Sequence, residues 1–289
     1  MPNSAAVAAR ATSWSLRDRD LDLASPLGAG IVNVTDDSFY EGARSGTPEQ
    51  AVADGVRLLE AGFDLLDVGA VAARSGPPVS PADEEEELVP AVAALAEKAT
   101  VPISADTFSP PVARSAVAAG AQIVNDIGGG TPEMLDAVAE AGCGYVLMHI
   151  EGPPRVDRPP PRLDDPVEHL SSWFEERIAA AVEAGVDERR IAIDPGFDFD
   201  LSLADDLEIM RRLDELHSLG RPLFISLSRK DFLGAVLAGS WEERLPAADR
   251  EWATCAAAAL AAAAGAQILR LHDASALDAM RVAGRIADG

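Results

Sequence analysis

The sequence has 289 residues, 48% of them hydrophobic, which is enough for one large domain or two small ones around a substantial core. Its 24 basic and 48 acidic residues give a formal net charge of −24. This charge disfavours nucleic acid and anionic membrane surfaces as partners, because both need a cationic footprint.

Residues 1–28 lack the long apolar segment of a secretory signal, and we expect an N-terminal extension there that covers the bottom of the following domain. No stretch reaches the roughly 18 apolar residues of a membrane helix. The two cysteines, Cys143 and Cys255, show no disulfide framework or metal-binding spacing. Together these features predict a soluble, cytoplasmic protein.

From residue 29 to residue 289 one pattern recurs, in which a short apolar run is followed by a loop and an alanine-rich amphipathic helix. The predicted strands are 30–34, 64–69, 101–106, 121–126, 144–149, 190–194, 221–227 and 266–272, and the helices centre near 55, 92, 114, 136, 176, 210, 256 and 280. Eight strand–helix units predict a single-domain (β/α)₈ TIM barrel. A doubly wound open sheet is the main rival, but no strand is followed by its G-x-G-x-x-G fingerprint.

Polar residues mark the carboxyl ends of these strands, where a barrel places its active site. They are Asn33, Asp67 with Arg74 beyond it, Asp106, Asn125 with Asp126, Met148 with His149, Asp194, Ser228 to Lys230, and Arg270 with His272. Carboxylates, an amide and a lysine suit a flat, nitrogen-rich heterocycle, and Arg74, Arg270 and His272 suit a phosphate or pyrophosphate. The alternative is that strand-end Asp and Asn residues only cap the helices that follow.

Two other histidines, His169 and His217, fall within predicted helices, and we expect both at the surface.

In this order, the motifs resemble those of the dihydropteroate synthase family. "GIVNVTDDSF", "DVGAVAARSG", "VPISADT", "GAQIVNDIGGG", "MHIEGPP", "DPGFDF", "ISLSRKDFLG" and "LRLHD" carry the resemblance from about residue 29 to residue 285. The family has a (β/α)₈ barrel fold and is usually dimeric. Its members join 6-hydroxymethyl-7,8-dihydropterin diphosphate to p-aminobenzoate and release pyrophosphate with the help of Mg²⁺, in folate biosynthesis.

The resemblance implies a role for each matching residue. The pterin would be held by Asp106, Asn125, Asp194 and Lys230, with Met148 on its face; the diphosphate by Asn33, Arg74, Arg270 and His272; and Mg²⁺ near Asn33. Lys230, Arg74 and Asp106 are the candidate catalytic residues. Two loops, around Asp37, Ser38 and Phe39 and around Arg74 and Ser75, would close over the second substrate together with Asp231.

The sequence departs from the family pattern where the second substrate would bind. Ala70 to Ala73 replace the polar residues that usually precede the arginine of the second loop, and Asp231 follows the "SRK" motif, where it would repel an aminobenzoate carboxylate. Three alternatives therefore stay open: a divergent paralogue that uses another amine, a pterin-binding protein with little turnover, and a methyltetrahydrofolate-dependent methyltransferase domain.

Overall fold

The computed structural model describes residues 10–34, 48–74, 76 and 78–287. Its main sheet consists of eight parallel strands in the order β8-β7-β6-β5-β4-β3-β10-β9. They are β3 (Leu27–Asn33), β4 (Leu65–Gly69), β5 (Ile103–Asp106), β6 (Ile123–Asp126), β7 (Gly144–Met148), β8 (Ile191–Asp194), β9 (Phe224–Ser226) and β10 (Ile268–Leu271). A parallel bridge between Ile193 and Leu223 links β8 to the segment before β9, so the sheet closes on itself. The predicted barrel is confirmed.

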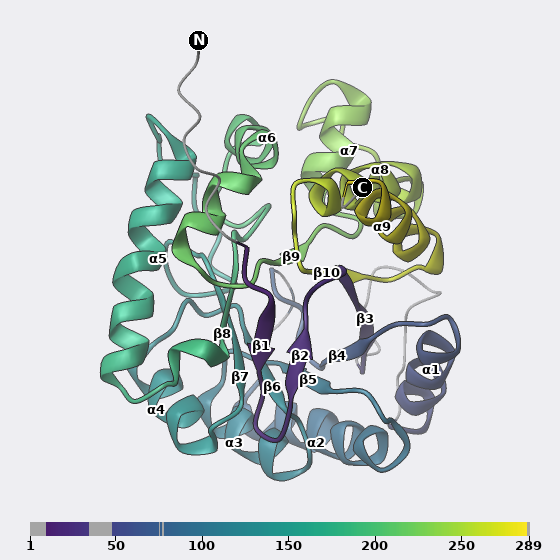
Figure 1. Ribbon diagram of the computed structural model, residues 1–289, viewed down its shortest axis with the longest axis vertical. Coiled ribbons are helices and arrows are strands. Elements are labelled where there is room, and N and C mark those ends of the chain that lie inside the picture. The colour runs from purple at the N-terminus through teal and green to yellow at the C-terminus, as the bar shows by residue number, and fades with distance from the viewer. Residues whose placement is uncertain (1–9, 35–47, 75, 77, 288–289) are drawn as a thin grey trace.

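Nine α-helices surround the strands in the described part of the chain (Figure 1). They are α1 (Pro48–Glu60), α2 (Pro81–Lys98), α3 (Pro110–Ala118), α4 (Pro132–Ala141), α5 (Pro166–Glu183), α6 (Leu203–Arg211), α7 (Asp231–Ala238), α8 (Glu251–Ala263) and α9 (Ala274–Ala287). Each of α1 to α5 begins at a proline, whose fixed φ suits the first helical position. The short helix α7 has no counterpart among the predicted helices. None of the helices described is both long and apolar enough to cross a membrane.

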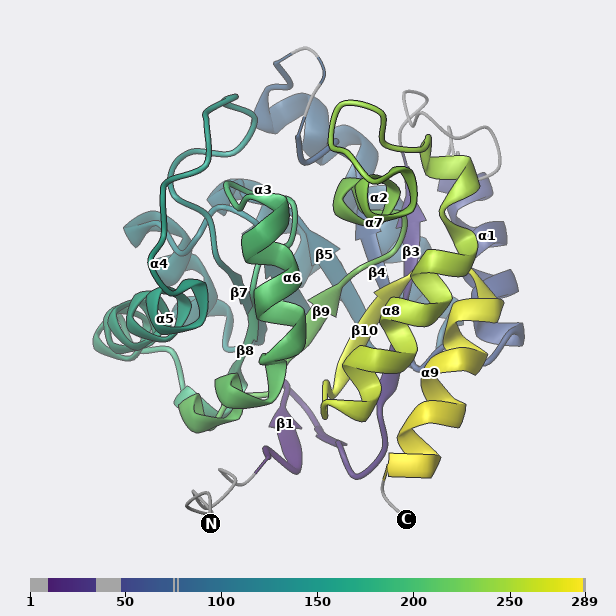
Figure 2. The ribbon, with the colours of Figure 1, turned by 90° about the horizontal axis from the view of Figure 1, so that it is seen from above.

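The first 28 residues contain an antiparallel pair, β1 (Ser13–Ser15) and β2 (Asp20–Asp22). Figure 2 shows β1 at one end of the barrel, opposite the loops that follow the strands. Trp14, Leu16 and Leu23 pack there against inward-facing strand residues such as Leu65 and Phe224. The first barrel strand begins at Leu27, two residues before the predicted start of the barrel. The apolar layer formed with the hairpin seals this end of the barrel.

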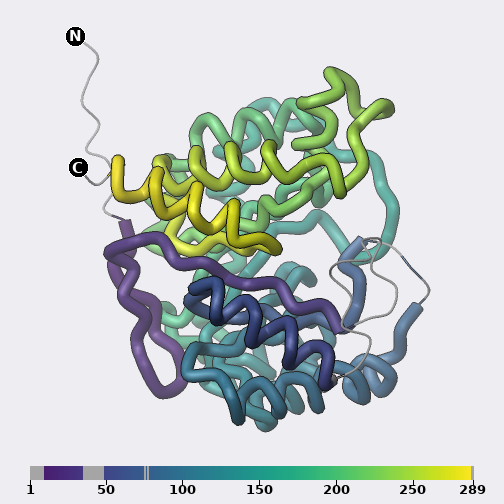
Figure 3. Tube along the Cα trace, turned by 90° about the vertical axis from the view of Figure 1, so that its right-hand side faces the viewer, coloured from purple at the N-terminus to yellow at the C-terminus, as the bar shows by residue number. Residues whose placement is uncertain are grey.

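The first barrel strand lies beside the last one, so segments from the beginning and the end of the barrel are neighbours (Figure 3). β3 pairs with β10, and Pro26 lies directly against Gly284 of α9. Closer to the carboxyl ends of the strands, beyond the sealed layer, the inward-facing side chains are polar instead of apolar. These residues form the candidate site.

Candidate active site at the carboxyl ends of the strands

A network of charged and amide side chains crosses the barrel interior from four strands. Arg270 of β10 donates from Nη2 to Asp106 Oδ2 of β5 at 2.7 Å and from Nε to Asp67 of β4. Asn125 of β6 donates to Asp67 Oδ2 at 3.1 Å. Three predicted site residues therefore meet around Asp67, which is completely buried. The sequence marked Asp67 as a strand-end residue, but we assigned it no ligand.

The pKa of Asp106 is shifted by this environment. Burial raises it to about 7, an effect that the charge of Arg270 opposes and that of Asp67 reinforces. A carboxyl group whose pKa lies near neutral pH in a barrel mouth is typical of a functional site.

Asp194 and Lys230 form a second group on the neighbouring side of the barrel. Asp194 accepts hydrogen bonds from Gly196 N and Ser226 Oγ, both at 2.8 Å. Lys230 Nζ donates to Phe197 O at 2.7 Å and lies 4.4 Å from the centre of the Phe199 ring. Burial raises the pKa of Asp194, although the charge of Lys230 opposes this shift.

The same burial lowers the pKa of Lys230, although Asp198 and Asp194 oppose the change. Of the two carboxylates, Asp198 has the larger effect. It adopts a left-handed backbone conformation (φ 67°) and accepts hydrogen bonds from the first two backbone N–H groups of α7, those of Asp231 and Phe232. The start of α7, and with it Lys230, is thereby fixed against the loop after β8.

In the described part of the chain, Asp106, Asn125 and Asp194 do not cap the helices that follow them, which was the alternative explanation for their positions. Side-chain caps come instead from Ser80 on α2, Thr131 on α4, Asp165 on α5 and Ser202 on α6. Asp126 is the residue with a local structural role, since it accepts hydrogen bonds from Gly128 N, Gly130 N and the Tyr145 hydroxyl. The inward-facing Asp106, Asn125 and Asp194 are therefore available for a ligand.

Arg74 lies on the Lys230 side of the site. Its Nη1 is 3.1 Å from Asp231 Oδ2 and 3.8 Å from Asp198 Oδ2, and its guanidinium lies 5.9 Å from the Phe199 ring centre. Its contacts among the described residues are thus with α7 and the loop after β8, whereas we expected it beside Arg270 and His272.

His272 contributes a hydrogen-bonding group rather than a positive charge. Its Nδ1 lies 2.8 Å from Ser228 Oγ. Burial lowers the pKa of His272 to about 3, and the charges of Arg229 and Arg270 add to the effect. The imidazole is therefore neutral at pH 7 and can bind an anion only through an N–H group.

The expected repulsion by Asp231 is offset by three arginines. Arg250 Nη1 lies 2.7 Å from Asp231 Oδ1, while Arg74 and Arg244 lie 3.1 and 3.4 Å from Oδ2. Burial raises the pKa of Asp231, but the hydrogen bond and charge of Arg250 and the charges of the other two outweigh it and leave the pKa below its usual value. The carboxylate is ionised, and the three arginines around it compensate its negative charge locally.

This cluster forms one wall of a pocket of ≈1080 Å³ beside Lys230. Its lining includes Arg74, Phe199, Asp231 and Arg250, together with residues of the loop after β7 such as Ile150, Arg155 and Arg158. A cavity of this size with convergent polar groups can hold a small organic ligand. Of the predicted residues, Asp37, Ser38, Phe39 and Ser75 lie outside the described residues.

Comparison with known proteins agrees with this arrangement. Residues 29–272 match the family described as pterin binding enzyme. The chain is 37% identical over 265 residues to dihydropteroate synthase of Escherichia coli K12, covering 91% of this chain and 92% of that protein. It is 39% identical over 261 residues to the enzyme of Mycobacterium leprae, covering 88% and 91%.

Solved structures of the same enzyme share the fold. Xanthomonas albilineans dihydropteroate synthase with 4-aminobenzoic acid matches with a TM-score of 0.84 and 40% identity, covering 96% of this chain and 98% of that one. The Yersinia pestis enzyme in a sulfonamide complex gives a TM-score of 0.89 at 34% identity, covering 96% and 100%. With its pterin-binding motifs spread around a barrel of this kind, the chain belongs to the dihydropteroate synthase family.

Proposed function

We propose that this chain condenses 6-hydroxymethyl-7,8-dihydropterin diphosphate with p-aminobenzoate, using the site at the carboxyl ends of its strands. The methylene–oxygen bond breaks and its electron pair leaves with pyrophosphate. The amine nitrogen then bonds to the methylene carbon and loses a proton. The observation that carries the assignment is the joint placement of Asp106, Asn125, Asp194 and Lys230 around one barrel mouth.

We assign the pterin to the two interior groups already described. The carboxylate of Asp194 can accept from two neighbouring N–H groups of the heterocycle, and Lys230 can donate to a ring acceptor. Asp106 and Asn125 would meet the opposite edge of the ring. Met148, buried at the end of β7, supplies an apolar contact for its face.

We assign the diphosphate to Arg270, His272 and Asn33. Cations and N–H donors aimed at the leaving-group oxygens stabilise the charge that develops as the methylene–oxygen bond breaks. We assign the second substrate to Arg74, Asp231 and the arginines around them. The same substrate is assigned to the loop residues Asp37, Ser38, Phe39 and Ser75. Exclusion of water from the pocket would protect the cationic methylene until the amine reacts.

Oxygen donors at this end of the barrel suit Mg²⁺, which binds few protein ligands and favours substrate phosphates. The amide oxygen of Asn33 would hold it together with the diphosphate, and Asp67 Oδ1, which has no hydrogen-bond partner among the described residues, is a further oxygen nearby in the strand register. When bound, the ion would neutralise charge on the leaving group.

The experiment that tests the proposal measures pyrophosphate release from pterin diphosphate with and without p-aminobenzoate. We expect release only when p-aminobenzoate is present. Release only with another aromatic amine would instead identify a paralogue with a different acceptor, and binding without release would identify a pterin-binding protein.

Arg74→Ala is expected to lower kcat by about 10–100-fold, the range for loss of one charge-assisted contact, while pterin affinity changes much less. The reason is that Arg74 contacts Asp231 and Asp198 on the side of the second substrate. Steady-state kinetics and pterin titration measure the two effects. Arg114→Ala is a matched control, because Arg114 pairs with Glu140 and is 43% exposed, against 44% for Arg74. An unchanged kcat in Arg74→Ala would remove this arginine from the mechanism.

The pKa of Asp106 predicts the pH dependence of pterin binding. With a pKa of about 7, the carboxyl is mostly protonated at pH 6 and mostly ionised at pH 8. Because the ionised form accepts N–H groups of the pterin, affinity should rise as the pH rises through about 7. Titration with 6-hydroxymethyl-7,8-dihydropterin, which has no phosphate to titrate, measures this. Asp106→Asn should bind more weakly at pH 8 and lose this dependence; an identical profile in the variant would contradict the assignment.

We also propose that the protein is a homodimer. α7, α8 and α9 expose a set of large apolar side chains: Val236, Leu237, Trp252, Leu260, Val282 and Ile286. Trp252 is 83% exposed and Leu260 65%, which is unusual for a surface that stays in water. Leu260→Glu is expected to shift the mass measured by light scattering from dimer to monomer. A wild-type chain that is monomeric at high concentration would refute the proposal.

A further inference from the structure

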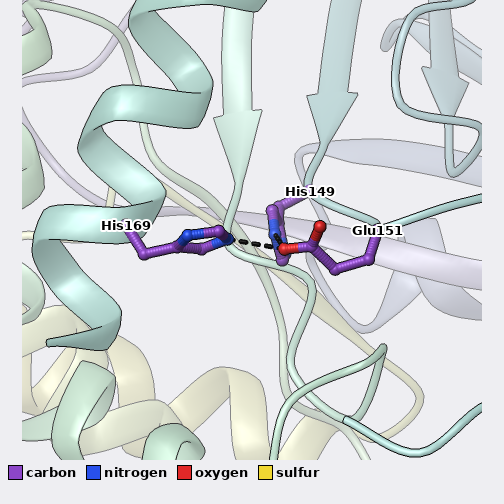
Figure 4. A group of neighbouring side chains, drawn as sticks. All are labelled: His149, Glu151 and His169. Atoms are coloured by element: carbon purple, nitrogen blue, oxygen red, sulfur yellow. Dashed lines mark hydrogen bonds and ion pairs between the residues drawn. The ribbon is translucent and has the colours of Figure 1, made fainter. Parts of the chain in front are cut away.

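Outside the proposed pterin site, the side chains of two histidines and a glutamate converge next to the end of β7, the strand that carries Met148. Figure 4 shows His149 at the end of β7, Glu151 in the following loop and His169 on α5, with their side chains directed at one another. Glu151 Oε1 lies 3.1 Å from His149 Nε2 and 2.5 Å from His169 Nε2. One potential ligand atom from each residue lies within 4.8 Å of the other two.

The fold holds the first of these residues rigidly. His149 is completely buried, and its backbone N–H donates to Asp194 O at 2.9 Å. Gly196 packs so closely against the His149 carbonyl that a Cβ there would overlap with it. On the other side, the imidazole meets the edge of Trp173, with ring centres 5.0 Å apart. One imidazole is therefore preorganised, as a metal ligand must be.

The other two residues can adjust. Glu151 and His169 have side chains that are 26% and 32% exposed. Tetrahedral ligands at zinc bond lengths lie about 3.3 Å apart. An ion therefore needs the carboxylate oxygen to move away from His169 Nε2, now 2.5 Å distant, and the exposed side chains of Glu151 and His169 to adjust around the fixed His149.

We propose that His149, Glu151 and His169 bind a divalent first-row transition-metal ion of the Zn²⁺ class. Imidazole nitrogens with one carboxylate favour such ions over Mg²⁺, which prefers oxygen ligands. Binding requires each imidazole to carry its proton on Nδ1, leaving the Nε2 lone pair for the metal. His149 Nδ1 has no hydrogen-bond partner among the described residues. A missing partner of this kind typically weakens metal binding about 10–100-fold, so we expect moderate affinity.

The ion would tie the loop after β7 to the first turn of α5. Ile150, Pro153, Arg155 and Arg158 of this loop line the pocket beside Lys230. Metal binding at the cluster would therefore hold one wall of that pocket in place and raise the melting temperature of the protein, since a ligand that binds only the folded chain stabilises it.

Calorimetric titration with Zn²⁺ in excess Mg²⁺, followed by thermal melting, tests the proposal. We expect one equivalent of Zn²⁺ to bind and to raise the melting temperature. Glu151→Gln and His169→Ala should each weaken binding at least about 10-fold, because each removes one of three ligands. Glu168→Gln, which changes an exposed carboxylate one residue before His169, should bind as the wild type does.

Circular dichroism without metal verifies that the variants are folded. Because Glu151 and His169 are both partly exposed, one variant still tests the proposal if the other does not fold. Lys230→Ala should retain Zn²⁺ binding, which separates this site from the proposed pterin site. The proposal is overturned if the wild type does not bind Zn²⁺ or if Mg²⁺ displaces the bound Zn²⁺. It is also overturned if Glu151→Gln and His169→Ala bind Zn²⁺ as tightly as the wild type does.

Discussion

Lys230→Ala is expected to lower pterin affinity about 100-fold or more. The substitution removes a cation that donates hydrogen bonds inside the barrel mouth, and a charge-assisted hydrogen bond of this kind contributes about 1.5–3 kcal/mol. It also leaves the buried carboxylates of Asp194 and Asp198 without the opposing charge that they have in the wild type. Titration with 6-hydroxymethyl-7,8-dihydropterin measures the effect.

The sequence supplies a matched control, because Lys98 is its only other lysine. Lys98 is exposed in the last turn of α2, and Lys98→Ala should leave pterin affinity unchanged. Asp194→Asn, which keeps the size of the side chain but replaces one acceptor by a donor, should weaken binding about 10–100-fold. Normal binding by Lys230→Ala would show that the pterin site has been placed wrongly.

Asp67→Ala is expected to lower the free energy of unfolding by about 3–5 kcal/mol, the cost of removing one partner from a buried ion pair. Asp67 is completely buried and accepts hydrogen bonds from both Arg270 and Asn125, so its loss leaves two donors inside the barrel without their partner. Denaturant unfolding measures the difference. Asp136→Ala, at an exposed position of α4, should change the stability by less than about 0.5 kcal/mol.

The pairing itself is tested by a double-mutant cycle with Arg270→Ala. Because both substitutions break the same interaction, the double variant should be less destabilised than the sum of the single variants. Additive effects, or an unchanged midpoint in Asp67→Ala, would contradict the role assigned to this network.

The barrel could be predicted from the sequence because its strands are apolar runs that end in polar residues. All eight barrel strands begin within three residues of the predicted start and end within one residue of the predicted end, and β4 and β8 begin within one residue and end as predicted. The helix α7 was missed because its residues Asp231–Ala238 follow the "SRK" motif directly, without a proline or a serine cap to mark its start. The hairpin of β1 and β2 was missed because each strand has only three residues.

The individual strand-end residues could be predicted from the sequence, but several of the residues that they contact could not. Asp67 lies two residues before the end of its strand, and only the barrel register directs it towards Arg270. Asp198 takes an uncommon left-handed conformation to reach the start of α7, which no local pattern indicates. His217 was expected at the surface and is buried with a hydrogen bond to Ala264 O, so that prediction was wrong.

Formation of 7,8-dihydropteroate tests the central claim most directly. The purified protein is incubated with pterin diphosphate, p-aminobenzoate and Mg²⁺, and the product is quantified by mass spectrometry together with pyrophosphate. We predict equal amounts of the two products from the wild type and far less of both from Lys230→Ala under the same conditions. Pyrophosphate without dihydropteroate from the wild type, or dihydropteroate at the wild-type rate from Lys230→Ala, would contradict the account.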